Sequence, residues 1–266
     1  MPKLVGNIQF TGNMGNMTAY KMRGHDDVIV RRTSAPTKFQ LKHSPGFANV
    51  RRNNMEWKSS TQAAAQLRRA MNRTIHLSDN NISAPLNGLT LKICKLSTIG
   101  TWGTRPVLYS VHKDKLAGYN FNLKNMFDSI VRSAVNCTIS RETNTATIQL
   151  PSLEPGVQLK FPWKQPVYRF VLQLGAVSDC MYDEKRKDYK VITNTEFIHA
   201  YAETEWLAVK KCFEGRTFEL VFPKPELIDD SKTFILSIGI EMGNMEVPGE
   251  IASVKYAGAG KILAVG

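Results

Sequence analysis

The C-terminal half of the chain alternates between short apolar runs and turn residues. Alternation of apolar and polar positions is clearest in Thr145–Leu150, Tyr168–Leu174 and Phe234–Ile240. A period of two is typical of strands that bury one face and expose the other. We expect strands at 135–140, 145–150, 167–177, 189–193, 197–209, 217–222, 233–241, 252–256 and 261–265. Their spacing predicts an antiparallel β-sandwich or jelly-roll-like body over residues 134–266.

A glycine-rich arm forms residues 1–32, where Gly6, Gly12, Gly15 and Gly24 separate short alternating runs. Because glycine adopts the positive φ of tight turns, we expect short strands, with a hairpin turn at residues 25–27. The arm is too poor in large apolar residues to fold alone, so it must pair with its own body or with a neighbouring chain. The residues expected to make these contacts are Ile8, Phe10, Met17, Ala19, Tyr20, Val28 and Val30.

The region between arm and sandwich shows helical patterns. Two prolines and several small polar residues predict an extended linker over 33–45. Ser44-Pro45 then favours a helix start, and Val50, Trp57, Ala64 and Met71 recur every seven residues, which predicts one long helix over about 46–75. Within the helical and mixed region 46–133, residues 83–97 fit both helical spacing (Leu86, Leu89, Ile93, Leu96) and strand spacing (Leu89, Leu91, Ile93), and the opening Ser83-Ala84-Pro85 favours a helix. We also expect a strand at 107–111 and a short helix at 124–131. The fold class is therefore mainly β (α+β).

Positive charge is concentrated near the N-terminus. Residues 1–75 hold 13 Lys and Arg against 3 Asp and Glu, which is +10 of the formal +12. Such a concentration suggests nucleic acid or another polyanion as partner, but a solvated face or a contact with an acidic neighbour would also explain it. Polyanion binding would require arginines that converge on one surface. The candidates are Arg31, Arg32, Arg51, Arg52, Arg68, Arg69 and Arg73.

Motifs for catalysis or metal binding are missing from the sequence. The five histidines have no H-x-x-x-H spacing and the four cysteines no C-x-x-C pair. Residues 258–262 (GAGKI) lack the spacing of a phosphate-binding loop, so we interpret them as a turn into the last strand. His199, Tyr201, Glu203 and Glu205 alternate on one strand face, with Asp179 and Asp183 in the preceding hairpin. Residues of these types could form a metal or acid–base site, but a hydrated sheet face explains the same pattern more simply.

These observations predict a protein that is not an enzyme and needs no cofactor, metal or small-molecule substrate. Residues 1–13 lack the apolar run and the small-residue cleavage site of a signal peptide, and no later segment offers about 18 consecutive apolar residues, so we expect neither general secretion nor a membrane span. We therefore expect a cytoplasmic protein or a component of a virion or other assembled particle.

The arm also carries a short motif, G-x-x-G-N-x-x-x-Y-x-x-x-G, formed by Gly12, Gly15, Asn16, Tyr20 and Gly24. With Val30-Arg31, the Arg51-Arg52 pair and the C-terminal VKYAGAGKILAVG, it resembles a group of Bacteroidota proteins without established activity. Their arms look like those of small phage-type structural proteins, so the resemblance implies a structural setting and no catalytic residues.

We therefore expect a structural or assembly protein whose arm adds strands to a neighbouring subunit in a homo-oligomer or filament. The alternative is a basic protein that binds nucleic acid through the arginine-rich helix.

Overall fold

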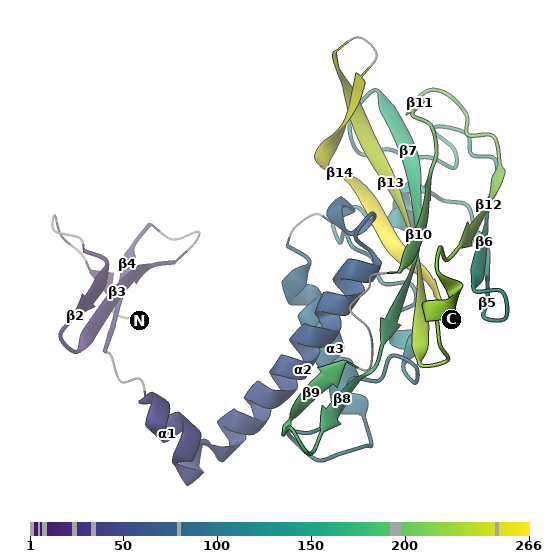
Figure 1. Cartoon of the computed structure of the whole chain (residues 1–266). Helices are drawn as coiled ribbons and strands as arrows, with labels where there is room; N and C mark the ends of the chain where they lie inside the picture. The colour runs from purple at the N-terminus through teal and green to yellow at the C-terminus, as the bar shows by residue number, and fades with distance from the viewer. Residues whose placement is uncertain are drawn as a thin grey trace. The chain divides into compact units, whose positions relative to one another are not determined.

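The computed structural model describes residues 3–4, 6, 10–22, 26–32, 36–78, 81–191, 198–247 and 250–266. Its contacts divide the chain into two compact units, Met1–Arg51 and Arg52–Gly266, which we call the N-terminal unit and the body. Figure 1 shows the elements of both.

The N-terminal unit contains a small antiparallel sheet with the strand order β1-β4-β3-β2. The strands are β1 (Lys3–Leu4), β2 (Gly12–Met14), β3 (Met17–Lys21) and β4 (Val28–Arg32). Gly15 and Asn16 join β2 to β3 in a two-residue turn, and Gly15 has a φ of 57°. The sequence therefore predicts β3, β4 and the use of glycine in a tight turn correctly, but it does not predict β1 and β2. Phe10, which is expected in a strand, lies outside the strands, and Ile8 lies outside the described residues. Residues 23–25, which include part of the predicted hairpin turn, lie outside the described residues.

The segment expected to be an extended linker is partly helical. Helix α1 (Lys38–His43) begins with a capping box, in which the Thr37 hydroxyl accepts from Gln40 N and the Gln40 side chain accepts from Thr37 N. Both bonds satisfy donors at the helix start, so they outweigh the small polar composition of this stretch. Pro45 then opens a short 3-10 helix, η1 (Pro45–Phe47), as the proline pattern indicated.

The long predicted helix is shorter than expected. Helix α2 spans Ala48–Ala70 and is followed by turns and a 3-10 helix, η2 (Ile75–Leu77). Ala64 and Met71 of the predicted stripe are buried, but Val50 and Trp57 are exposed. At this end the helix buries Glu56, Ser59 and Ser60 instead, because polar partners lie there.

The described residues of the body form one five-stranded, one three-stranded and one two-stranded antiparallel sheet. The five-stranded sheet has the order β10-β7-β13-β14, with β11 also paired to β7, and the three-stranded sheet has the order β12-β6-β5. The protein is thus mainly β with one long helix, which confirms the fold class. The strands are β5 (Asn136–Ser140), β6 (Thr145–Leu150), β7 (Val167–Ser178), β8 (Cys180–Asp183), β9 (Asp188–Val191), β10 (His199–Glu203), β11 (Leu207–Ala208), β12 (Arg216–Val221), β13 (Lys232–Val247) and β14 (Glu250–Val265).

One hydrophobic core lies between the five-stranded and three-stranded sheets. It includes Phe170 and Leu172 of β7, Ile238 of β13, Ile148 of β6 and Leu220 of β12. Residues at i and i+2 on one strand face share this core, as the alternation predicted.

The opposite face of the five-stranded sheet packs against α2, α3 (Ser83–Leu96) and the segment after α2. Figure 1 shows both helices beside this sheet. The predicted helix at 83–97 is confirmed by α3. The short predicted helix at 124–131 is present as α4 (Phe127–Ile130). The strand expected at 107–111 is only an isolated bridge from Val107 to Cys180.

Glycines in the five-stranded sheet let the segments packed on its helix-covered face approach the strands closely. A Cβ at Gly175 would lie 2.2 Å from the Ala70 carbonyl oxygen, and a Cβ at Gly239 would lie 2.2 Å from Leu77 Cδ1. Gly258 and Gly260 similarly accommodate Leu77 and Phe121. The predicted turn at 258–262 is therefore wrong, since these residues lie inside β14, which spans both expected strands, 252–256 and 261–265. Glycine is required at 258 and 260 because neighbouring side chains occupy the space that a Cβ would need.

Among the described residues, no helix combines the length and apolar character that crossing a bilayer requires.

Candidate functional site

The sheet of the N-terminal unit has a very small core. Of the described residues of this unit only Ala19, Val28 and Ile29 are buried. Methionines remain exposed around them, with exposed fractions of 52% for Met14 and 39% for Met17. Among the predicted arm residues, Phe10, Tyr20 and Val30 are half-buried, and Ile8 lies outside the described residues. The sheet therefore leaves apolar side chains at the surface of the N-terminal unit.

The outer edge of this sheet is β2. Met14 and Met17 flank the two-residue turn and therefore form a hydrogen-bonded pair, so the next pair, Asn13 and Thr18, is not hydrogen-bonded through the backbone. The N–H and C=O groups of Asn13 consequently point away from β3, toward the free edge. The Asn13 side chain accepts a 2.8 Å bond from the Thr18 hydroxyl on the sheet face. β2 therefore presents an unpaired strand edge of three residues, within the part of the chain that the structure describes.

The arginines predicted to bind a polyanion are spread over separate contacts. Arg31 lies over the Tyr20 ring, with Cζ 5.5 Å from the ring centroid, and Arg32 is exposed at the end of β4. Arg51 donates to the carbonyls of Leu41 and Ser44 at 2.9 and 3.0 Å and so fixes the turn between α1 and α2.

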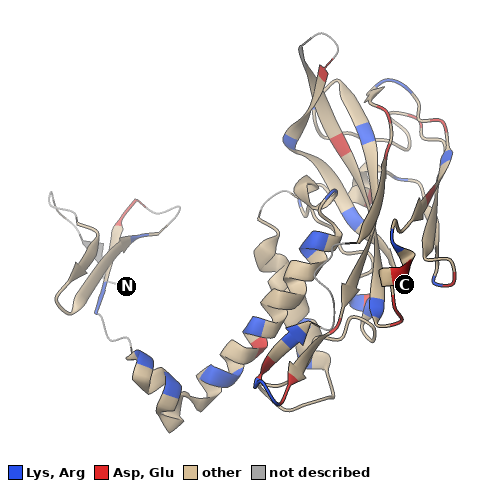
Figure 2. Ribbon diagram, in the orientation of Figure 1, with Lys and Arg blue, Asp and Glu red and all other residues tan. Residues whose placement is uncertain are grey.

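In the body the remaining predicted arginines also diverge. Arg52 stacks on Trp102 at 5.4 Å and Arg73 on Tyr201 at 4.3 Å. Arg68 is half-buried and Arg69 exposed. Sixteen residues separate Arg52 from Arg68, which in a helix places them on nearly opposite sides and about 24 Å apart along the axis. Figure 2 shows Lys and Arg at separate positions along α2.

A network of ionised side chains lies on the helix-side face of the five-stranded sheet. Glu241 of β13 is buried and accepts bonds from Arg169 Nε at 2.6 Å, His76 Nε2 at 2.7 Å and the Ser253 hydroxyl. Arg169 also donates to Glu203 at 2.6 Å, and its guanidinium lies 4.5 Å from the Trp206 ring centroid. Burial raises the pKa of the Glu241 carboxyl, but the hydrogen bonds from His76, Ser253 and Arg169 outweigh burial and hold the pKa at about 2.

Of the alternating residues that the sequence analysis named, Glu203 belongs to this network through its bond from Arg169. His199, Tyr201 and Glu203 do share one face of β10, with the His199 and Tyr201 ring centroids 6.3 Å apart. Glu205 follows the end of β10. Asp179 and Asp183 serve elsewhere: Asp179 accepts the Tyr109 and Ser110 amides, and Asp183 accepts amides of the β8–β9 turn.

Hydrogen bonds fix the segment between α2 and η2 to the five-stranded sheet. Gln173 bonds to Asn72 Oδ1 at 2.7 Å and to Arg73 N at 2.8 Å, and the Thr74 and Ser237 hydroxyls lie 2.8 Å apart. With His76 on Glu241, these bonds satisfy a polar strip that would otherwise be buried without partners. We therefore interpret the Glu241 network as a structural clamp. Sequence reasoning missed it because the bonded partners come from different elements and lie 12 to 165 positions apart.

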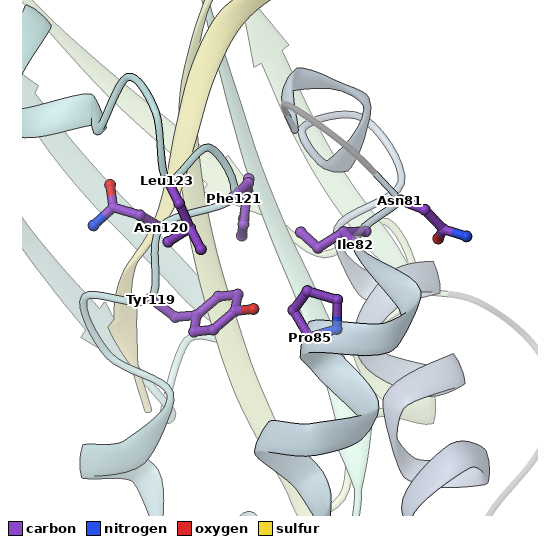
Figure 3. A pocket seen from close by; sticks show the side chains of 7 residues that line it. All are labelled: Asn81, Ile82, Pro85, Tyr119, Asn120, Phe121 and Leu123. Atoms are coloured by element: carbon purple, nitrogen blue, oxygen red, sulfur yellow. The ribbon is translucent and has the colours of Figure 1, made fainter. Parts of the chain in front are cut away.

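A small hollow lies between the start of α3 and the segment 119–123. Figure 3 shows Pro85 facing Tyr119 across it, with Ile82, Phe121 and Leu123 completing an apolar lining. Its volume of about 30 Å³ is an order of magnitude below that of ordinary ligand pockets. Among the described residues, no group of three or more His, Cys, Asp or Glu side chains is arranged to hold a metal ion.

Comparison with protein-family models, curated proteins and solved structures finds no significant match to this chain. The resemblance of the arm motif to a Bacteroidota group therefore stays a prediction.

Proposed function

We propose that the protein is a structural subunit that associates with further copies of itself through its N-terminal unit. The observation that carries this proposal is that the N-terminal unit buries few residues and exposes apolar ones. Only three of its described residues are buried, whereas Met14, Met17 and an unpaired strand edge are exposed. Sheets this small are marginal in water unless something packs on them.

Strand addition fits the geometry of β2. The outward N–H and C=O groups of Asn13 can bond to the edge of another sheet, and main-chain bonds of this kind give affinity without a deep pocket. The exposed methionines next to this edge would be covered in the same event, since their flexible side chains adapt to irregular surfaces. Within each unit taken by itself, the described arginines make separate contacts, which gives the polyanion alternative no comparable observation.

The proposal is tested by light scattering on the full-length protein and two variants of one residue. Asn13→Pro removes the outward N–H and places a ring on the free edge, yet costs no bond between β2 and β3. Asn13→Ala is the matched control, because it removes the same side-chain bond to Thr18 but keeps the amide.

We expect the wild-type and Asn13→Ala proteins to form oligomers of equal mass. We expect Asn13→Pro to associate about tenfold more weakly, as the loss of about one main-chain bond predicts. A wild-type protein that is monomeric at every concentration, or an Asn13→Pro protein that associates as strongly as Asn13→Ala, would contradict the proposal.

A further inference from the structure

A second open strand edge lies at one end of the five-stranded sheet of the body. The pairing of β13 with β7 ends at Gly243 and Val167, whereas β13 and β14 continue as a hairpin. Among the described residues, 244–247 and 250–252 pair only with each other. Figure 1 shows this two-stranded ribbon extending past the end of β7.

The outer edge of β14 already holds an added segment farther along. Gly118 N donates to Ile262 O at 2.8 Å, Ile262 N donates to Tyr119 O at 2.9 Å, and Phe121 N donates to Gly260 O at 2.8 Å. The Asn122 side chain reaches Gly258 O at 2.9 Å, where this cover ends. The edge of β14 therefore binds a short extended segment through main-chain bonds at residues 260–262. The described chain leaves the same edge uncovered at residues 250–254.

A bulge sets the length of this uncovered run. The register between β13 and β14 shifts between Glu241 and Gly243, and Tyr256 there adopts a φ of 66°. Lys255 lies over the Tyr256 ring at 5.0 Å. Bulges and lysines are the usual protection of a strand edge, so they close the edge beyond Val254. Residues 250–254 (EIASV) contain neither lysine, arginine nor proline, and this open run exceeds the three residues of β2.

The ribbon and the N-terminal unit carry opposite net charge. The ribbon residues 244–254 contain two glutamates and no Lys or Arg, and Glu250 is exposed. The N-terminal unit, residues 1–51, contains eight Lys and Arg against two Asp, a net charge of +6. Opposite charge on the ribbon and the N-terminal unit favours their encounter, whereas like charge disfavours the association of two basic N-terminal units.

We propose that β2 of one copy adds to the open edge of β14, residues 250–254, in a second copy. This inference rests on the proposed function, because it names the surface that receives the N-terminal unit. Donor and recipient are different surfaces, so the contact is heterologous and repeats from copy to copy into a ring or a filament.

The experiment is photo-crosslinking of the full-length protein with p-benzoylphenylalanine in place of Asn13. This substitution keeps the backbone amide that strand addition uses. Copies that carry the probe are mixed with heavy-isotope-labelled wild-type copies, and mass spectrometry identifies the linked peptides. We expect links between the probe and the heavy peptide that contains residues 250–254.

Other links separate the two proposals. Links to β2 or to another sheet edge of the heavy copy would overturn this inference and leave self-association through the N-terminal unit intact. Links confined to the probe's own chain, or no links together with a monomeric mass, would overturn both.

A charge reversal provides an independent readout. Glu250→Lys places a positive charge on the recipient edge and should weaken self-association about three- to tenfold, as the loss and reversal of exposed charge interactions predict. Glu219→Lys is the matched control, since Glu219 is exposed on β12, away from the ribbon. Equal association of the two variants would overturn the assignment of the edge at 250–254.

Discussion

Replacing Glu241 by glutamine removes the negative charge from the centre of the buried clamp and nearly preserves the shape of the side chain. Arg169 then keeps Glu203 as its only carboxylate partner in the network. Breaking a buried ion pair on one side leaves the other charge poorly compensated, which typically costs about 3 to 5 kcal/mol. We therefore expect Glu241→Gln to lower the free energy of unfolding by about 3 kcal/mol at neutral pH.

The pH dependence gives a second, sharper expectation. The pKa of Glu241 is about 2 in the folded protein and 4.5 ordinarily, a gap that corresponds to about 3 kcal/mol. Because the folded pKa is the lower one, this stability is present above the ordinary pKa and is lost as the pH falls toward 2. The wild-type protein should thus lose about 3 kcal/mol more than the variant between about pH 5 and pH 2.

Urea unfolding followed by circular dichroism at a series of pH values measures both quantities. Glu219→Gln is the control, since this exposed carboxylate should leave stability within about 0.5 kcal/mol of the wild type. If Glu241→Gln were as stable as the control, or lost stability toward low pH as steeply as the wild type, the clamp would contribute nothing of this kind and the reasoning would be refuted.

Two further predictions concern the packing of the body. Gly239→Ala should destabilise the body by about 1 to 3 kcal/mol because the new methyl group overlaps Leu77. Leu77→Ala should relieve this clash, so in urea unfolding the double variant should lose less stability than the sum of the two single losses. Strictly additive losses would contradict this packing. Cys212 is exposed, whereas Cys180 is buried and burial raises its pKa to about 12; a thiol reagent on the native protein should therefore modify Cys212 first and Cys180 only upon unfolding, and equal rates would show that the body opens readily.

Local patterns predict the regular strands and helices of this protein well. The alternation in β7 and β13 reflects their two differently packed faces, and the Gly15 turn follows from the φ that a two-residue hairpin requires. Helix α1 could also have been found, since Thr37 and Gln40 have the spacing of a capping box.

Features that depend on distant residues could not be predicted. Gly258 resembles a turn residue in the sequence, and only the position of Leu77 shows that it is required inside a strand. Arg51 resembles a charged surface residue, although it bonds to backbone carbonyls. Glu241 shows no local sign of its partners, because Arg169 and His76 come from other elements.

The central claim is that a neighbouring copy stabilises the sheet of the N-terminal unit. The most direct measurement is amide hydrogen exchange on the full-length protein, compared between dilute and concentrated solutions. We predict that the amides of β2, β3 and β4 gain protection as concentration rises, whereas those of β6 and β7 in the body exchange at the same rates throughout. Equal protection of the N-terminal sheet at both concentrations, with the protein monomeric, would contradict the account.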